Sequence, residues 1–301
     1  MTGGELDLVL NAVICAMRDG EPAFFTIDGP GAPSALPAGP LDPARDRTLE
    51  GGLRRWVAER TDVTLGYVEQ LYTFGDEGRG SDGRAQDSRL VSIGYLALTR
   101  LERPQPGWVD LYGAFPWEDW RRGRPDLVDA LLAALKDWAG ANAQRRARRE
   151  LAFGSPQLPW NDERVLDRYE LLYEAGLVHE AMVDGRAAEH ALMERTGRPL
   201  ASDHRRIVAT ALARLRAKVK YRPVVFELME PAFTLSRLQD HVEAIYGRQV
   251  HKQNFRRMVE TAQLVEPTGE TARGRSGRPA KLYRFRPAVI RERPAPGLRV
   301  R

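Results

Sequence analysis

The chain has 301 residues, of which 43% are hydrophobic and 29% charged, and its formal net charge is +5 at pH 7. This length suffices for two or three domains with cores of ordinary size. The single cysteine, Cys15, excludes a disulfide framework and a cysteine-based metal site. No apolar run reaches the roughly 18 residues needed to span a bilayer, and the first residues lack the basic start of an export signal. We therefore expect a cytoplasmic protein with no membrane partner.

The charge is divided unevenly along the chain. Residues 205–301 contain 22 Lys and Arg against 8 Asp and Glu, a balance of +14, whereas residues 1–204 contain 24 against 33, a balance of −9. A basic domain attached to an acidic body is typical of proteins in which one domain meets phosphates. The sequence therefore predicts that the C-terminal third binds nucleic acid.

The N-terminal part predicts the order strand, strand, helix, strand, strand. These are two strands within residues 6–28, a helix over residues 48–60, and strands over residues 67–74 and 90–98. Asp19 and Gly20 form the first turn, and Thr48 can cap the helix. This alternation indicates an α/β domain.

The middle of the chain predicts helices, because apolar side chains recur there at helical spacing. They cover residues 126–149, 161–174, 179–194 and 203–219. The first ends in a basic run, residues 145–149, whose charges would complement the dipole at a helix C-terminus. Residues 151–204 are interpreted as a helical connector.

Residues 234–285 predict a helix, a short turn, a second helix and a hairpin, which is a winged helix-turn-helix. The first helix begins at Thr234 or Ser236 and ends at Gly247, and the second runs from about His251 to Gln263. The second helix buries one apolar face and leaves groove-reading and phosphate-binding side chains on its early turns. The residues expected to contact DNA are Thr234, Ser236, Arg237, His251, Lys252, Gln253, Asn254, Arg256, Arg257, Arg273, Arg275, Arg278 and Lys281.

Two alternatives stay open for this segment. It could be a small helical domain whose basic faces are only solvated surface. Asn254 could read a base, bind a phosphate or cap the helix.

Residues 36–63 resemble a degraded Nudix box, whose helix carries Arg-Glu-U-x-Glu-Glu-x-Gly-U, with U an aliphatic residue. Placing Arg55 on the first position puts Trp56 and Arg60 where the first and third glutamates belong, and leaves Glu59 as the one matching carboxylate. A Nudix hydrolase uses three carboxylates on one helix face to hold magnesium against a pyrophosphate. One carboxylate beside an arginine should not hold that ion, so we expect neither a metal site nor catalytic residues.

A degenerate Nudix-like domain followed by a winged helix resembles the Nudix-related transcriptional regulators of NAD metabolism, the NrtR type. The most characteristic stretches are LRRWVAERTDVTLGYVEQLYTFGD, VLDRYELLYEAGLV, YGRQVHKQNFRRMVE and GRPAKLYRF. The resemblance implies a fold with a Nudix-type α/β/α sandwich around a mixed sheet, a helical connector and a winged helix-turn-helix domain. We assign residues 1–150 to ligand sensing, 151–204 to the connector, 205–290 to DNA binding and 291–301 to a disordered tail.

The same resemblance implies a homodimer that represses NAD-metabolism or sugar-utilisation genes at a palindromic operator in double-stranded DNA. ADP-ribose or a related nucleotide would be the effector that lowers DNA affinity, and no cofactor would be required. The candidate ligand-binding residues are Gly39, Arg55, Glu59, Arg60, Tyr72, Phe74, Arg89 and Tyr95. Arginines can hydrogen-bond a diphosphate and aromatic rings can stack on a base, although the same residues could form a plain helix face and an ordinary core.

Two other functions stay open. The chain could be an active Nudix hydrolase of ADP-ribose or nucleoside diphosphate sugars, with Glu50 and Glu59 binding metal in another register. It could also be an RNA-binding adaptor, a weaker alternative because no aromatic stacking platform interleaves the basic segment.

Overall fold

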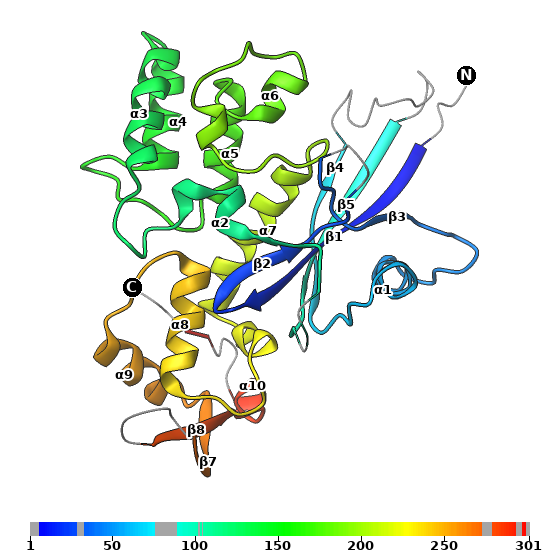
Figure 1. Cartoon of the computed structure of the whole chain (residues 1–301), viewed down its shortest axis with the longest axis vertical. Helices are drawn as coiled ribbons and strands as arrows, with labels where there is room; N and C mark the ends of the chain where they lie inside the picture. The colour runs from blue at the N-terminus through cyan, green and yellow to red at the C-terminus, as the bar shows by residue number, and fades with distance from the viewer. Residues whose placement is uncertain are drawn as a thin grey trace.

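The computed structural model describes residues 6–28, 33–75, 89–101, 103, 105–272, 279–292 and 297–298, with the side chains of Leu6 and Arg89 excepted. It shows a β-sheet with helices on both sides and a winged helix at one end (Figure 1). In the described parts of the chain, no helix combines the length and apolar character that crossing a membrane would require.

The sheet has the strand order β4-β5-β1-β2-β6, with β3 also paired to β1. The strands are β1 (Leu6–Arg18), β2 (Glu21–Phe25), β3 (Ala38–Pro40), β4 (Val68–Phe74), β5 (Arg89–Leu98) and β6 (Trp108–Asp110). The pair β1–β5 is parallel and the other pairs are antiparallel, so the sheet is mixed. The predicted turn joins β1 to β2, and Asp19 and Gly20 both have positive φ, at 54° and 90°, as two-residue hairpin turns require.

Both faces of the sheet are buried, because side chains alternate along each strand. In β1, Val13 and Cys15 face one core and Ala12 and Ile14 face the other. The second core is covered by α1 (Leu49–Arg60), which Thr48 caps as predicted, and the first by α7 (His204–Val219) and the helices around it. The predicted α/β/α sandwich is confirmed.

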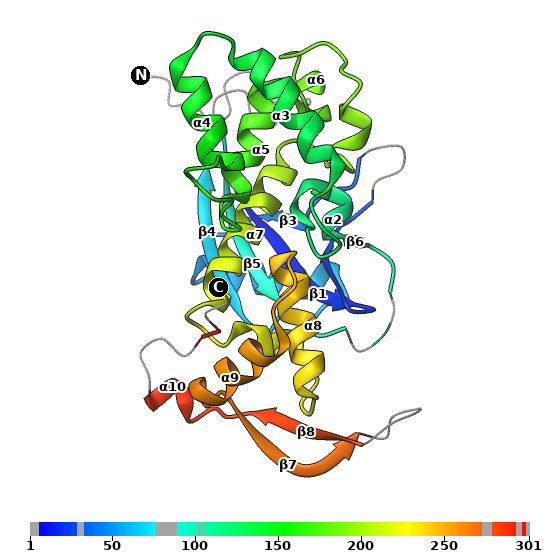
Figure 2. The same cartoon turned by 90° about the vertical axis from the view of Figure 1, so that its left-hand side faces the viewer.

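The helical elements between β6 and the winged helix are α2 (Leu111–Ala114), η1 (Pro116–Glu118), α3 (Asp126–Ala139), α4 (Ala143–Phe153), α5 (Val165–Glu174), α6 (His179–Val183), η2 (Met193–Arg195), α7 and η3 (Val224–Leu228). The helices α2 to α6 lie on the α7 side of the sheet (Figures 1 and 2). The predicted helices over residues 161–174 and 203–219 correspond to α5 and α7.

Two helix predictions in this region are wrong. The helix predicted over residues 126–149 is two helices, because Gly140 takes φ 47° and Asn142 caps α4. Arg145 and Arg146 therefore lie at the start of α4, yet their guanidinium groups donate to the carbonyls of Trp138 and Gly140 at the end of α3. The helix predicted over residues 179–194 ends at Val183.

The C-terminal module has the predicted helix-turn-helix and hairpin. Its elements are α8 (Leu235–Tyr246), α9 (Lys252–Ala262), β7 (Val265–Ala272), β8 (Ala280–Phe285) and α10 (Val289–Glu292). The Thr234 hydroxyl caps α8 by accepting from the amide of Arg237, and Gly247 ends the helix in the left-handed region at φ 68°. A bridge between Phe233 and Tyr283 adds a short third strand to the β7–β8 hairpin.

The winged helix and the residue Leu298 near the C-terminus both pack against the sheet domain and α7. One hydrophobic core runs from the sheet through α7 to α8 and α9. In residues 291–301, Leu298 is 1% exposed and its amide donates to the carbonyl of Val219. The prediction of a disordered tail is therefore wrong at Leu298, because a buried leucine and a backbone hydrogen bond hold that residue.

Packing of α1 on the sheet predicts a coupled pair of substitutions. A Cβ atom at the buried Gly39 of β3 would lie 1.9 Å from Nε1 of Trp56 on α1. We expect Gly39→Ala to lower the free energy of unfolding by about 1–3 kcal/mol through overpacking. In the background Trp56→Ala, the same substitution should cost at least about 1 kcal/mol less. Urea unfolding of the four proteins measures this, and strictly additive losses would contradict the contact.

Burial of His241 on α8 predicts a pH dependence of stability. The side chain is 1% exposed, and burial lowers its pKa to about 4. The unfolded chain, whose histidine has an ordinary pKa near 6.5, binds more protons than the folded chain between these values. Stability should therefore fall as pH drops from about 6.5 to 4, by roughly 1–2 kcal/mol at pH 5 relative to His241→Leu. Parallel pH profiles of unfolding free energy for the two proteins would contradict this assignment.

Candidate nucleic-acid interface and ligand domain

The helix α9 presents polar and cationic side chains to solvent. Phe255 and Val259 anchor it, at 0% and 1% exposure. The exposed residues at its start and on its other faces are His251, Lys252, Gln253, Asn254, Arg256 and Arg257, followed by Glu260 and Thr261 near its end. Asn254 is the third residue of the helix and His251 is the N-cap, so Asn254 does not cap the helix and is available to a base or a phosphate.

The cations of α9 differ from most arginines of the body in having no internal anion. Within the part of the chain that the structure describes, no ion pair engages Lys252, Arg256 or Arg257. By contrast, body arginines such as Arg148 and Arg206 are paired with Glu174 and Glu170. Unpaired, solvated cations on one helix are the groups that can replace counterions along a DNA backbone.

The remaining predicted DNA contacts are spread over three places. Ser236 is exposed near the start of α8 and Lys281 is exposed on β8 of the wing. Arg237 lies apart from the α9 cations, because its guanidinium is within 4.0 Å of Glu230 and faces the β1–β2 turn at Gly20. The predicted tip residues Arg273, Arg275 and Arg278 lie outside the described residues. Arg284, which pairs with Glu266 across the hairpin, was not among the predicted residues.

Arg55 of the degraded box is paired with carboxylates of the same region. Nε and Nη2 of Arg55 donate to the two oxygens of Asp46 at 2.8 and 2.9 Å, and Nη1 donates to Glu59 at 3.0 Å. The hydrogen bonds from Arg55 lower the pKa of Asp46 to about 2. Glu59 also pairs with Arg45. Arg55 and Glu59 thus tie the loop before α1 to the helix.

Trp56, in place of the first box glutamate, packs into the core over Gly39. Arg60, in place of the third, is exposed at the end of α1. Over the described ranges, no group of three or more His, Cys, Asp or Glu side chains is arranged to hold a metal ion.

The sheet separates the predicted aromatic ligand residues. Tyr72 and Phe74 contact each other edge to face at 5.3 Å, with Tyr72 61% exposed and Phe74 buried on the side of α7. Tyr95 lies in the core on the side of α1, and burial raises the pKa of its hydroxyl. Arg89 begins β5, and its side chain lies outside the described part. Tyr95 and the pair Tyr72–Phe74 therefore cannot line one pocket in this arrangement.

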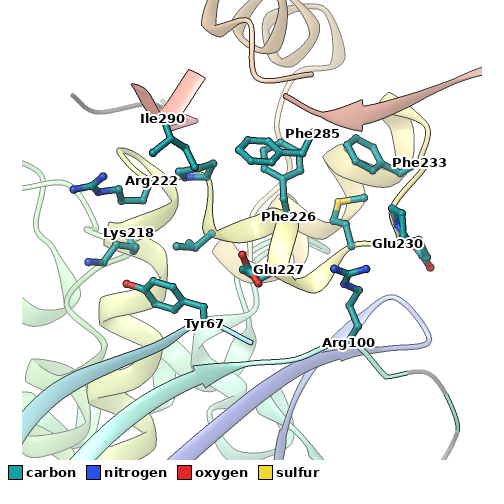
Figure 3. Close-up of a pocket in the computed structure, with 14 residues that line it drawn as sticks. Tyr67, Arg100, Lys218, Arg222, Phe226, Glu227, Glu230, Phe233, Phe285 and Ile290 are labelled. Carbon is teal, nitrogen blue, oxygen red and sulfur yellow. The ribbon is translucent and has the colours of Figure 1, made fainter. Parts of the chain in front are cut away.

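A cleft of about 530 Å³ lies between the sheet, the end of α7 and the winged helix (Figure 3). Its mixed lining includes Tyr67, Arg100, Lys218, Arg222, Glu227, Glu230, Phe226, Phe233 and Phe285. Phe226 stacks on Phe285 with ring centroids 4.6 Å apart. These residues come from four distant segments, so no local sequence signal indicated the cleft.

The C-terminal module is similar to known DNA-binding domains, and the whole fold is similar to solved structures. A family model for the NrtR DNA-binding winged helix domain matches residues 225–285. The ADPR responsive transcriptional repressor NtrR of Acinetobacter baylyi is 41% identical over 86 residues, which are 29% of this chain and 34% of that protein. The match thus spans about a third of the length of the curated relative.

Solved structures match almost the whole chain. Shewanella oneidensis NrtR in complex with a 27mer DNA has a TM-score of 0.57 and 23% identity, covering 94% of this chain and 95% of that one. A MutT/nudix family protein from Enterococcus faecalis has a TM-score of 0.53 and 17% identity, covering 94% and 87%. The C-terminal module of this chain thus matches the NrtR DNA-binding winged helix domain, and the whole chain shares the fold of NrtR, in which a Nudix-like sandwich precedes a winged helix.

Proposed function

We propose that this protein is a transcriptional regulator that binds double-stranded DNA through α9 and the wing. The observation that carries the proposal is the set of unpaired cations on α9, within a domain that matches a DNA-binding family. Residues 1–150 would form the sensing part and residues 151–204 the connection. Within the predicted DNA-binding part, residues 205–290, α7 packs on the sheet, so residues 225–285 would be the segment that binds DNA. The protein would act in the cytoplasm.

We further propose that it is a repressor that ADP-ribose or a related nucleotide releases from its operator. Support comes from the relative in Acinetobacter, whose name states both repression and the ADP-ribose response. As a homodimer, the protein would place two copies of α9 in major grooves about one helical turn, roughly 34–36 Å, apart on a palindrome. The effector must bind one arrangement of the dimer more tightly, since equal binding to both would shift nothing.

Catalysis is not part of the proposal, because the carboxylates of the α1 region are already neutralised. Asp46 and Glu59 are held by Arg55, and Glu50 is held by Arg54. A dication would have to displace these arginines before it could activate water.

Loss of two α9 cations should weaken binding to every duplex. We expect Arg256→Ala/Arg257→Ala to lower affinity for specific and unrelated DNA roughly tenfold or more at physiological salt, and to reduce the slope of log affinity against log salt by about 2. The specific probe is a duplex selected by the wild-type protein from a randomised library. The control, Lys136→Ala/Arg146→Ala, removes two exposed cations from α3 and α4 at the far end of the molecule (Figure 1). Equal behaviour of the two double variants would contradict the docking surface.

Addition of ADP-ribose should release the selected duplex, because the effector favours the arrangement with lower DNA affinity. A mobility-shift titration with and without ADP-ribose measures this, with AMP as the control nucleotide. Release by ADP-ribose alone supports the sensor, and unchanged binding contradicts ADP-ribose as effector. Turnover of ADP-ribose with magnesium that Glu59→Ala abolishes would instead establish a hydrolase.

A further inference from the structure

The first helix of the helix-turn-helix ends against side chains of the body. A helix leaves its last carbonyls without partners inside the helix. In α8, the Tyr112 hydroxyl donates to the carbonyl of Ala244 at 2.6 Å, and Nε of Arg216 donates to the carbonyl of Ile245 at 3.0 Å. Two residues after Ile245, the carbonyl of Gly247 accepts from the amide of Trp120 at 2.6 Å. Body residues thus satisfy this helix end directly before the turn into α9.

These donors belong to a buried charged cluster. The side chains of Glu118, Arg168 and Arg216 are each 0% exposed. Arg168 donates to both oxygens of Glu118 at 2.6 and 3.0 Å, and Arg216 donates to Oε2 at 2.6 Å. The two arginines hold the pKa of Glu118 below its ordinary value despite burial, and burial raises the pKa of Tyr112 to about 12, which keeps the hydroxyl a donor. The cluster therefore has fixed charges and fixed donors.

The backbones of α8 and the body also touch at this place. A Cβ atom at Gly247 would lie 2.3 Å from the carbonyl oxygen of Glu118. The hydroxyl of Tyr246 donates back to the carbonyl of Arg216 at 3.0 Å. On another side of the winged helix lies the open cleft of Figure 3, where side chains of mixed charge line a volume of about 530 Å³. The buried cluster is thus the close-packed contact of the winged helix with the body.

We propose that Tyr112 and Arg216 are positioning residues that set the orientation of α9 by holding the end of α8. This inference rests on the proposed DNA binding. An α9 held in one orientation can place its cations and polar side chains on a defined site, whereas non-specific binding needs only the charges. Disturbing the cluster should therefore reduce discrimination between DNA sequences and leave charge-driven binding unchanged.

The test compares affinity for the selected duplex with affinity for an unrelated duplex. Tyr112→Phe removes one hydrogen bond to α8, and we expect it to weaken specific binding about three- to tenfold. Tyr173→Phe is its control, because that hydroxyl is also hydrogen-bonded, to Asp184 on the connector. Gly247→Ala should act in the same direction. Gly185→Ala is its control, since Gly185 has a similar φ of 66° and open space around it.

The outcomes separate the two proposals. Loss of specific affinity in Tyr112→Phe and Gly247→Ala, with unchanged non-specific affinity and salt slope, supports positioning. Equal losses on both duplexes, or no loss, overturn it. If the wild-type protein selects no duplex, the proposed DNA binding fails, and amide hydrogen exchange of α9 tests the positioning alone. Faster exchange over residues 252–262 in Tyr112→Phe but not in Tyr173→Phe supports it, and equal exchange overturns it.

Discussion

One buried carboxylate, Glu118, is shared by two buried arginines, Arg168 and Arg216, and the joint between the sheet domain and the winged helix depends on it. Removing an ion from water costs several kcal/mol, and a buried charge that loses its partner destabilises a protein by about 3–5 kcal/mol. The cluster is therefore stable only if η1, α5 and α7 come together in one arrangement. Because Arg216 also donates to the end of α8, the same arrangement holds the helix that directly precedes the turn into α9.

The helix α7 contacts both the sheet, where the ligand is proposed to bind, and α8, which precedes the proposed DNA-binding helix α9. Near its start, the guanidinium of Arg206 lies 5.6 Å from the ring centroid of Phe74 at the end of β4. Near its end, Arg216 holds α8 and Lys218 pairs with Glu69 of β4. A ligand that altered the packing of the sheet against α7 would therefore act on the support of α9. Coupling of this kind requires two discrete arrangements that the ligand binds with different affinity.

Local sequence signals predicted the winged helix well, because its elements are set by neighbouring residues. Thr234 and Gly247 bound α8, and the apolar spacing of α9 gives one buried face, as predicted. Gly140 and Asn142 could also have predicted the break between α3 and α4, because the apolar spacing that suggested one long helix stops at Trp138, before both residues. The sequence could not predict that the candidate ligand residues lie on opposite faces of the sheet. Phe74 and Tyr95 are on neighbouring strands, and only the strand register and a bulge in β4 determine which face each one occupies. No local sequence pattern predicted that Glu118 would be a buried ion-pair centre, because its partners Arg168 and Arg216 are 50 and 98 residues away.

The most direct test of the account places a probe on an introduced thiol. The chain's single native cysteine, Cys15, does not compete for the probe, because it is buried and burial raises its pKa to about 12. Gln253→Cys on α9 and Lys136→Cys on α3 would each introduce one exposed thiol that can carry a photoactivatable cross-linker. The account predicts that the probe at position 253 cross-links to the selected duplex and the probe at position 136 does not. Cross-linking from position 136 alone, or equally from both positions, would contradict the assignment of α9 as the surface that meets DNA.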